Sequence, residues 1–475
     1  MTLSIPAQRP DDQAAAEPSQ VSLPGSSVQP DTTETRPTLL RSLGLTDATL
    51  LVVGCIIGVG IFRTASSIAA YIQSPALILT LWLFGGLLSI SGALCYAELS
   101  AMFPASGGDY VYVKETYGRL WGFLFGWTKL FIERTGTIAI LGFVFAEYLR
   151  RIITFEEPAL RWFAAAAILL LTAVNVAGVR WGKYVQNVFT LLKIGALTAI
   201  VLVGAHAAMT HPPVTVDWSL PPLNSSAIQS MGVALIFVLW TYGGWTEAAY
   251  VAEEVKQPTR TVPAAIIGGV LLTTVLYLLV NWSYLLFVPI GELPQTPLVA
   301  ARVMQQVFGS AGSVFIASMI TCSAFGALNG YILTGARILY AMGQDHALFT
   351  RLTTIHPKLR TPALALWVNA LISVGLVFTK TLDQIMTYST VVISVFFAMS
   401  VFAVILLRQR KPHMARPYRA IGYPLTPLLF CLTMAGFILD VCVKKPSDAV
   451  FGFGLLLLGL PLYWWSEALR RHTHD

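Results

Sequence analysis

Charged residues are scarce in this sequence. Only 12% of its 475 residues are Asp, Glu, Lys or Arg, whereas a soluble domain has about 25%. Apolar residues make up 55% of the chain, and the mean hydropathy is +0.68. This balance excludes a mainly soluble protein and predicts a membrane protein with little soluble mass.

Cysteine and histidine are also few, and neither has a metal-ligand spacing. The five cysteines fall in or at the ends of apolar runs, so no loop disulfide is expected. The seven histidines are scattered and form no HExxH or similar zinc pattern. The chain also lacks a GxxxxGK[ST] loop and any nucleophile–base constellation. We therefore predict no cofactor, no metal site and no enzyme activity, and primary pumping is disfavoured.

Long apolar runs are the dominant feature that is present. A run of about 20 residues crosses the hydrocarbon core of a bilayer. Twelve such runs occur, at 45–71, 76–101, 120–149, 160–178, 184–205, 228–252, 262–289, 311–342, 362–379, 384–407, 423–443 and 449–467. They predict an all-α polytopic membrane protein of about 12 transmembrane helices over residues 43–467. Residues 1–42 are rich in Pro, Ser, Gln and acidic residues and predict a disordered tail, and residues 468–475 form a short second tail.

The positive charges are unevenly distributed between alternate loops. With the N-terminus placed inside the cell, inside segments carry roughly three times as many Lys and Arg residues as outside segments. This bias predicts that both termini are cytoplasmic and that the protein lies in the cell (inner) membrane. The sequence pI of about 9.1 is therefore a topology signal, and nucleic acid is not an expected partner.

Glycines interrupt two of the apolar runs near mid-membrane. The first run contains "GCIIGVGIF", Gly54 to Phe62, and the sixth contains "LWTYGGWTEAAY" with Gly243 and Gly244. Glycine costs about 1 kcal/mol against alanine inside a helix. Breaks in runs one and six predict two five-helix halves related as an inverted repeat, at about 43–206 and 228–407, followed by extra helices at about 423–467.

Two explanations of the first glycine motif remain open. Gly54 and Gly58 form a GxxxG, which often packs two membrane helices together. Alternatively, the glycines open the helix. Unwound backbone at membrane depth is tolerated only beside protein or a water-filled cavity. Freed amides at a half-helix N-terminus can bind a carboxylate, and freed carbonyls can bind an ammonium. Together these groups would suit the backbone of an amino acid.

Several stretches carry a family resemblance. They include "GVGIF", "GALCYAELSAMFPASGGDYVYVKETYG", "YGGWTEAAYVAEEVKQPTRTVPAAI", "GALNGYILTGARILYAMGQDHALF" and "IHPKLRTPALAL". These stretches occur in the same order as in the amino acid–polyamine–organocation (APC) superfamily, which the chain resembles. Within that superfamily it resembles a bacterial member of the L-type amino acid transporter (LAT) branch. The resemblance implies the LeuT-like five-plus-five fold with unwound helices one and six. It also implies sodium-independent transport of amino acids by alternating access, typically by exchange.

The resemblance also implies a substrate site. The carboxylate site falls on Gly58, Val59 and Gly60, and the amine site falls on carbonyls of Ile56, Trp240 and Gly243. Trp240 also matches an aromatic gate. The full set of candidate substrate-binding residues is Ile56, Ile57, Gly58, Val59, Gly60, Trp240, Tyr242, Gly243, Gly244 and Tyr284. Val59 replaces a frequent serine and Thr246 a frequent asparagine, so the resemblance leaves the side-chain selectivity open.

Lys193 is the most informative charged residue. It lies in the apolar stretch "FTLLKIGALTAIV", and an ionisable residue at that depth is a functional hypothesis by default. In the family, a lysine here takes the place of a sodium ion and links spans one, five and eight. Proton linkage through this lysine and simple snorkelling to the interface are the open alternatives.

Other polar residues are weaker candidates. Lys129 and Glu133 have the i, i+4 spacing of a structural ion pair. Four further residues are candidates for gating or for the pocket: Glu98, Glu247, Glu254 and Asn329. Glu254 lies near Lys256 and Arg260 in sequence, and these two residues are its candidate ion-pair partners. Alternatively, these charges lie at solvated helix ends.

These observations predict a sodium-independent exchanger of neutral amino acids. A proton-coupled amino acid symporter is the nearest alternative. A carrier of cationic amino acids or polyamines and a non-transporting amino acid sensor are less favoured. The expected partners are the substrates and the lipid bilayer. In animal relatives a cysteine between spans three and four joins a heavy chain, but the segment "RRIITFEEPALRW" has none, so no disulfide-linked heavy chain is expected.

Overall fold

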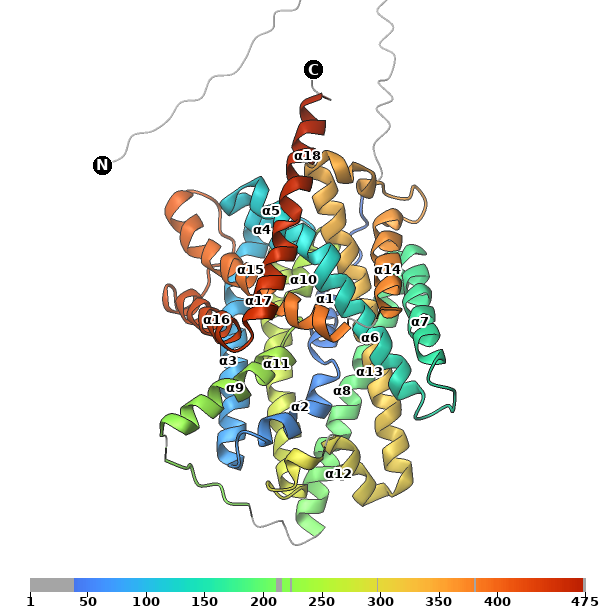
Figure 1. Ribbon diagram of the computed structural model, residues 1–475, viewed down its shortest axis with the longest axis vertical. Coiled ribbons are helices and arrows are strands. Elements are labelled where there is room, and N and C mark those ends of the chain that lie inside the picture. Colours follow the sequence, from blue (N-terminus) through green and yellow to red (C-terminus); the bar gives the residue numbers. More distant parts are fainter. Residues whose placement is uncertain (1–37, 211–215, 223, 297, 380–381, 473–475) are drawn as a thin grey trace, which may run out of the picture. The chain divides into compact units, whose positions relative to one another are not determined.

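The computed structural model in Figure 1 describes residues 38–210, 216–222, 224–296, 298–379 and 382–472. Most of the predicted N-terminal tail and the last three residues of the C-terminal tail lie outside these ranges. The regular structure of the described chain is helical, with one isolated parallel bridge between Leu43 and Val255.

The first half of the chain contains both long helices and short segments. In chain order they are α1 (Leu45–Ile56), α2 (Gly60–Ala69), α3 (Pro75–Met102), α4 (Asp109–Tyr117), α5 (Arg119–Thr128), the π-helical turn η1 (Lys129–Glu133), α6 (Arg134–Leu149), α7 (Ala159–Val176) and α8 (Val179–Thr210). The run predicted at 45–71 is therefore two helices, α1 and α2, which meet at an angle of 40°.

The second half has a comparable break. Its elements are α9 (Ser225–Thr241), α10 (Glu247–Tyr250), the 3-10 turn η2 (Ala252–Glu254), α11 (Pro258–Phe287), the 3-10 turn η3 (Leu293–Gln295), α12 (Val299–Phe308), α13 (Ser310–Asp345), the 3-10 turn η4 (Ala347–Thr353), α14 (Ala363–Val377), α15 (Leu382–Arg410), α16 (Leu425–Lys444), α17 (Pro446–Leu457) and α18 (Gly459–His472). The run predicted at 228–252 is thus divided between α9 and α10.

Each of the twelve predicted runs coincides with one helix or with helices joined end to end. By length and hydropathy, eight helices in the described ranges are able to cross a bilayer, or nine if α1 and α2 form one bent span. The other predicted runs do not meet this length and hydropathy criterion because their helices are short or interrupted, as at η1 and at the α9–α10 break. The prediction of an all-helical polytopic membrane protein is confirmed.

Local sequence explains where several helices start. The Ser74 side chain accepts a hydrogen bond from the amide of Leu77, and Pro75 occupies the first helical position of α3. The Asn224 side chain caps α9 by accepting the amide of Ala227 at 2.8 Å. Each cap fixes the entry of a long apolar helix.

Helix α1 lies within the bundle, whereas α9 extends toward its edge (Figure 1). Helix α1 packs against α8, α11 and α13, and α11 packs against α3. Every residue of α1 from Leu50 to Ile56 is buried, whereas Leu432 and Leu439 of α16 are 70% and 64% exposed. A helix buried on all sides is a core element, and an exposed apolar face suits contact with lipid.

Both ends of the described chain lie at the upper end of the bundle in Figure 1, which we call the terminal face. Helix α12 and the start of α9 lie toward the opposite end, which we call the distal face. Chain direction therefore takes α1 from the terminal face to its break and α2 onward to the distal face. Helix α9 runs the opposite way, from the distal face to its break.

Candidate functional site

The first break comprises Ile57, Gly58 and Val59, between α1 and α2. The two glycines of the GxxxG differ in their surroundings. A methyl group on Gly54 would lie 2.2 Å from Thr190 and 2.4 Å from Gln186, so this glycine permits close packing of α1 on α8. A methyl group on Gly58 would meet only the carbonyl of Ile56, at 4.0 Å. Helix packing therefore explains Gly54 and does not explain Gly58.

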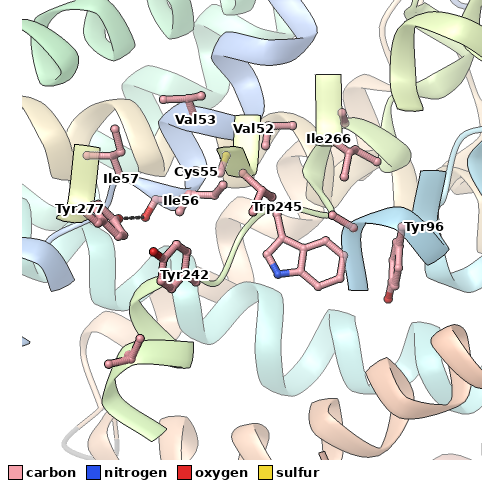
Figure 2. Close-up of a cluster of buried hydrophobic side chains, with 14 of the residues drawn as sticks. Val52, Val53, Cys55, Ile56, Ile57, Tyr96, Tyr242, Trp245, Ile266 and Tyr277 are labelled. Atoms are coloured by element: carbon pink, nitrogen blue, oxygen red, sulfur yellow. Dashed lines mark hydrogen bonds between the residues drawn. The ribbon is translucent and has the colours of Figure 1, made fainter. Parts of the chain in front are cut away.

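The second break is a turn from Tyr242 to Thr246, between α9 and α10. Gly244 has φ +103°, a conformation that side chains rarely adopt. A methyl group there would lie 2.8 Å from the carbonyl of Cys55. The two breaks therefore meet backbone to backbone, as the closeness of Cys55, Ile56 and Trp245 in Figure 2 also shows.

Lys193 reaches the first break from α8. Its Nζ donates hydrogen bonds to the carbonyls of Gly54 at 2.6 Å and Ile57 at 2.8 Å, and its side chain is 2% exposed. The hydroxyl of Ser323 on α13 also donates to Ile57, at 3.2 Å, and to Gly58, at 3.1 Å. A fixed ammonium thus satisfies carbonyls that the break removes from the helix ladder, and α1, α8 and α13 meet there.

Tyr277 of α11 occupies further carbonyls of the breaks. Its hydroxyl lies 3.0 Å from the carbonyl of Ile56 and 3.3 Å from that of Thr241 (Figure 2). The amide of Gly58 also donates to Ile56, at 2.8 Å. The carbonyl of Ile56, one of the predicted amine ligands, therefore already accepts hydrogen bonds from the protein.

Other main-chain groups at the breaks have no hydrogen-bond partner among the described residues. These are the amides of Val59, Gly60 and Ile61 at the start of α2, and the carbonyls of Tyr242 and Gly243 after α9. The free amides lie at a helix N-terminus, where the helix dipole favours negative charge. The arrangement thus offers anion-binding amides from one break and cation-binding carbonyls from the other.

Exposure differs along the predicted site. Gly58 and Val59 are half-buried, Gly243 is exposed, and the Trp240 side chain is 54% exposed. Ile56, Ile57, Gly60 and Tyr242 are buried, and Gly244 is half-buried. Residues 245–252, on the terminal side of the second break, are all buried. The accessible part of the site is therefore on the distal side of the breaks.

Tyr284 is placed differently from the other candidates. It lies on α11, seven residues after Tyr277, with a side chain that is 1% exposed. Its hydroxyl has no hydrogen-bond partner among the described residues. Its predicted role in lining the pocket stays a prediction, whereas the Tyr277 hydroxyl donates hydrogen bonds to the helix ends at both breaks.

A buried ionic cluster lies on the terminal side of the second break. Arg134 of α6 donates to both carboxylate oxygens of Glu247, at 3.0 and 3.1 Å, and the hydroxyl of Thr334 on α13 donates to the same carboxylate. The predicted Lys129–Glu133 pair forms at 3.0 Å, within the π-helical turn. Glu133 also lies 3.8 Å from Arg134, so the four charges form one group of zero net charge.

Glu254 has a different partner from those expected. Its carboxylate accepts from Arg337 of α13, at 2.8 Å from Nε and 3.2 Å from a terminal nitrogen, and both side chains are 0% exposed. Lys256 and Arg260, its neighbours in sequence, do not make this pair. The main-chain carbonyl of Glu254 accepts the amides of Ser42 and Leu43, both at 2.9 Å. The segment before α1 is thereby attached to the terminal end of the second broken span.

The remaining gating candidates join other helices. Glu98 of α3 accepts from Arg408 of α15 at 2.9 and 2.5 Å, and from the amide of Ala420 at 2.7 Å. Asn329 of α13 donates to Gly182 at 3.0 Å and to Gln186 at 3.1 Å, both on α8. Within the described chain, neither residue is hydrogen-bonded to a break.

Tyr277, Ser323, Arg134 and Arg337 are the site residues that sequence reasoning missed. Arg134 lies in the apolar run at 120–149 and Arg337 in the run at 311–342. A pattern search could have found the buried arginines, because an arginine within an apolar run requires a partner. No sequence signal distinguishes Tyr277 from Tyr284, since both are tyrosines of one apolar run. Among the described residues, no three His, Cys, Asp or Glu side chains are grouped to hold a metal ion.

Comparison with known proteins adds independent information. A family model described as "Amino acid permease" matches residues 43–451. The chain is 30% identical over 433 residues to the serine/threonine exchanger SteT of Bacillus subtilis, covering 90% of this chain and 97% of the relative. It is 31% identical to the mouse b(0,+)-type amino acid transporter 1, covering 92% of each, and 31% identical to the mouse large neutral amino acids transporter small subunit 2, covering 90% of this chain and 81% of the relative.

Proposed function

The chain belongs to the amino acid permease family of membrane transporters, and on this basis we propose that it is a sodium-independent exchanger of neutral amino acids. Transport by exchange and the preference for neutral substrates are consistent with the names of the relatives, which include a serine/threonine exchanger and a large neutral amino acid transporter.

The observation that carries this proposal is the set of free main-chain groups at the two breaks. The amides of Val59, Gly60 and Ile61 would bind the substrate carboxylate, and the carbonyls of Tyr242 and Gly243 would bind its ammonium. Main-chain groups recognise the part that all amino acids share. The apolar and aromatic walls around the site, including Trp240 as a mobile cover, would then select among substrate side chains.

The contacts of Lys193 support sodium independence. A sodium ion at an unwound membrane helix is normally coordinated by backbone carbonyls. Here an ammonium bound to the carbonyls of Gly54 and Ile57 already supplies a positive charge at such a position. The charge is covalently attached, so the first break would need no metal ion to remain open.

The pairing of Glu247 supports a neutral substrate. Glu247 directly follows the second break and is the acidic residue best placed to bind a cationic side chain. Its side chain is 3% exposed, and its carboxylate accepts hydrogen bonds from both terminal nitrogens of the Arg134 guanidinium. A cationic amino acid or polyamine would have to displace this pair, which disfavours that class of substrate.

We further propose that the terminal face is cytoplasmic, in keeping with the distribution of Lys and Arg, and that the protein lies in the inner membrane. The accessible distal side of the breaks would then correspond to an outward-facing state. The segment between α6 and α7 contains no cysteine, so the carrier is proposed to work without a disulfide-linked heavy chain.

The test is uptake of labelled amino acids into proteoliposomes without sodium and with equal pH on both sides. Labelled serine, threonine and leucine are each offered to vesicles loaded with the same unlabelled amino acid and to empty vesicles. The Gly244→Ala variant serves as the matched control, because a methyl group would press on the carbonyl of Cys55. We expect sodium-independent uptake into loaded vesicles of the unmodified protein only.

Other outcomes would revise the proposal in defined ways. Equal uptake into loaded and empty vesicles would reject obligatory exchange. If uptake into empty vesicles then increased with an acidic exterior, proton-coupled symport would replace the proposed mechanism. Saturable binding without uptake under any of these conditions would indicate a sensor.

A further inference from the structure

The hydroxyl of Tyr277 is placed between the ends of both broken helices. Ile56 is the last residue of α1 and Thr241 is the last residue of α9. The Tyr277 oxygen lies 3.0 Å and 3.3 Å from their carbonyls, and the side chain is 0% exposed. Carbonyls in the last turn of a helix have lost their intrahelical donors and need another partner. One phenol from α11 therefore serves two such carbonyls.

The ring of Tyr277 is fixed by other aromatic rings. Its centroid lies 5.4 Å from that of Trp82 on α3 and 5.2 Å from that of Tyr242. Figure 2 shows the Tyr277 hydroxyl directed at the main chain of Ile56 and the Tyr242 ring beside it. Since a buried ring held on two sides has little freedom to rotate, its hydroxyl defines a fixed point between the breaks.

We propose that Tyr277 is a positioning residue for transport, which holds the ends of α1 and α9 at the separation that the substrate requires. This inference rests on the proposed function of the breaks. Tyr277 acts through the backbone: it keeps the carbonyls of Ile56 and Thr241 directed at itself. The carbonyls of Tyr242 and Gly243, which accept no hydrogen bond from the described residues, are the ones left for the substrate ammonium.

The spacing of the breaks decides substrate affinity because the two ends of an amino acid bind to different breaks. The free amides belong to residues 59–61 and the free carbonyls to residues 242 and 243. The carboxylate and ammonium of the substrate are joined through one carbon atom, so the two sets of groups have to be held close together. Loss of the Tyr277 hydroxyl would leave the Thr241 carbonyl without a donor among the described residues and the Ile56 carbonyl with only the amide of Gly58. The link between the two helix ends would be lost, and the end of α9 would move to find another partner.

The test compares Tyr277→Phe with two control variants. Tyr112→Phe makes the same chemical change at a 0% exposed tyrosine whose hydroxyl has no partner among the described residues. Thr273→Val removes a buried hydroxyl from α11 itself, and in the described part of the chain that hydroxyl donates to Gly269 of the same helix alone, at 2.8 Å. Neither control contacts a break through its hydroxyl. All three changes remove one oxygen atom or replace it by a methyl group.

In proteoliposome exchange, Tyr277→Phe is expected to raise KM about tenfold, which corresponds to about 1.4 kcal/mol of binding. Vmax per reconstituted molecule should stay within about twofold, and both controls should keep the KM of the unmodified protein. A protein that merely folded less well would lower Vmax at unchanged KM. An unchanged KM in Tyr277→Phe, or an equal rise in all three variants, would overturn the proposal.

A second measurement reads the backbone without requiring transport. Cys55 lies beside the first break and is 3% exposed, so its alkylation by N-ethylmaleimide requires local opening. The other four cysteines, at positions 95, 322, 431 and 442, are first replaced by alanine. Tyr277→Phe should then increase the Cys55 labelling rate several-fold, by about fivefold or more, and neither control should do so.

The two measurements separate the inference from the proposed function. If the unmodified protein transported no amino acid, the proposed function would fail and the labelling rates alone would decide the role of Tyr277. Faster labelling only in Tyr277→Phe would support the role in holding the breaks. Equal labelling in all variants would refute that role, whatever the transport result.

Discussion

Disruption of the buried Arg134–Glu247 pair should produce a non-additive pattern of stability. We consider Arg134→Met, Glu247→Met and the double variant. Both side chains are at most 3% exposed, and two charge-assisted hydrogen bonds of 3.0 and 3.1 Å join them. Removal of one partner from a buried pair leaves the other charge uncompensated, which costs about 3–5 kcal/mol. Replacement of both by apolar side chains is often neutral or stabilising.

The surrounding charges predict that the single variants differ. Without Glu247, Arg134 still has Glu133 at 3.8 Å. Without Arg134, the hydroxyl of Thr334 is the one donor to Glu247 that remains among the described residues. Arg134→Met should therefore be the more destabilising change. In the double variant Thr334 can still donate to the carbonyl of Gly330, at 2.9 Å, so no hydroxyl is left without a partner.

The assay is thermal unfolding of the purified protein in detergent. For 475 residues, an unfolding entropy of about 2.1 cal/mol/K per residue makes 1 kcal/mol equivalent to about 1 °C of Tm. The single variants should lose about 3–5 °C, and the double variant should unfold within about 1–2 °C of the unmodified protein. Additive losses in the double variant, or a loss below about 1 °C in Arg134→Met, would refute the reasoning.

Three further predictions concern Gly244 and Lys193 at the breaks and His346, which follows the last residue of α13. Gly244→Ala should abolish exchange, because φ +103° and a contact of 2.8 Å with the carbonyl of Cys55 leave no room for a methyl group; uptake per folded molecule, normalised by size-exclusion recovery, checks this. Lys193→Met keeps the stem but removes the donor to two carbonyls, so exchange should fall at least about 100-fold and added sodium should not restore it. Burial, and then a neighbouring arginine, lower the pKa of His346 from 6.5 to about 4, so the unfolded chain binds this proton more readily than the folded chain. Stability should therefore fall as the pH falls from about 6.5 to 4, and His346→Gln should reduce that slope in a Tm–pH series.

Hydropathy and glycine placement predicted the helical architecture and indicated both breaks, and the structure separated the packing role of Gly54 from the break at Gly58. Apolar runs of bilayer length report burial in lipid or protein directly, so their positions survive in the structure. Gly243 and Gly244 marked a break because two adjacent glycines weaken a helix at one point. Lys193 was identifiable for a similar reason, since a charge within an apolar run requires a specific partner.

Pairings between distant segments were not predictable in the same way. Glu254 pairs with Arg337, 83 residues away, rather than with its sequence neighbours Lys256 and Arg260. Periodicity says which face of a helix is apolar, but it does not say which other helix that face meets. The choice of Tyr277 over Tyr284 likewise depends on how α11 is rotated toward the breaks. Such contacts are properties of the packed bundle and leave no local signal.

The contact between the segment before α1 and the end of the second broken span has a consequence for biosynthesis. Leu43 pairs with Val255, which the ribosome adds 212 residues later. At about 5–20 residues per second, the early segment waits roughly 10–40 seconds for its partner. Helix α1 therefore enters the membrane long before its terminal end can be fixed, and its final placement follows the synthesis of α10 and η2. The first span is thus made before the segment that fixes its terminal end, just as Glu98 of α3 precedes its partner Arg408 by 310 residues.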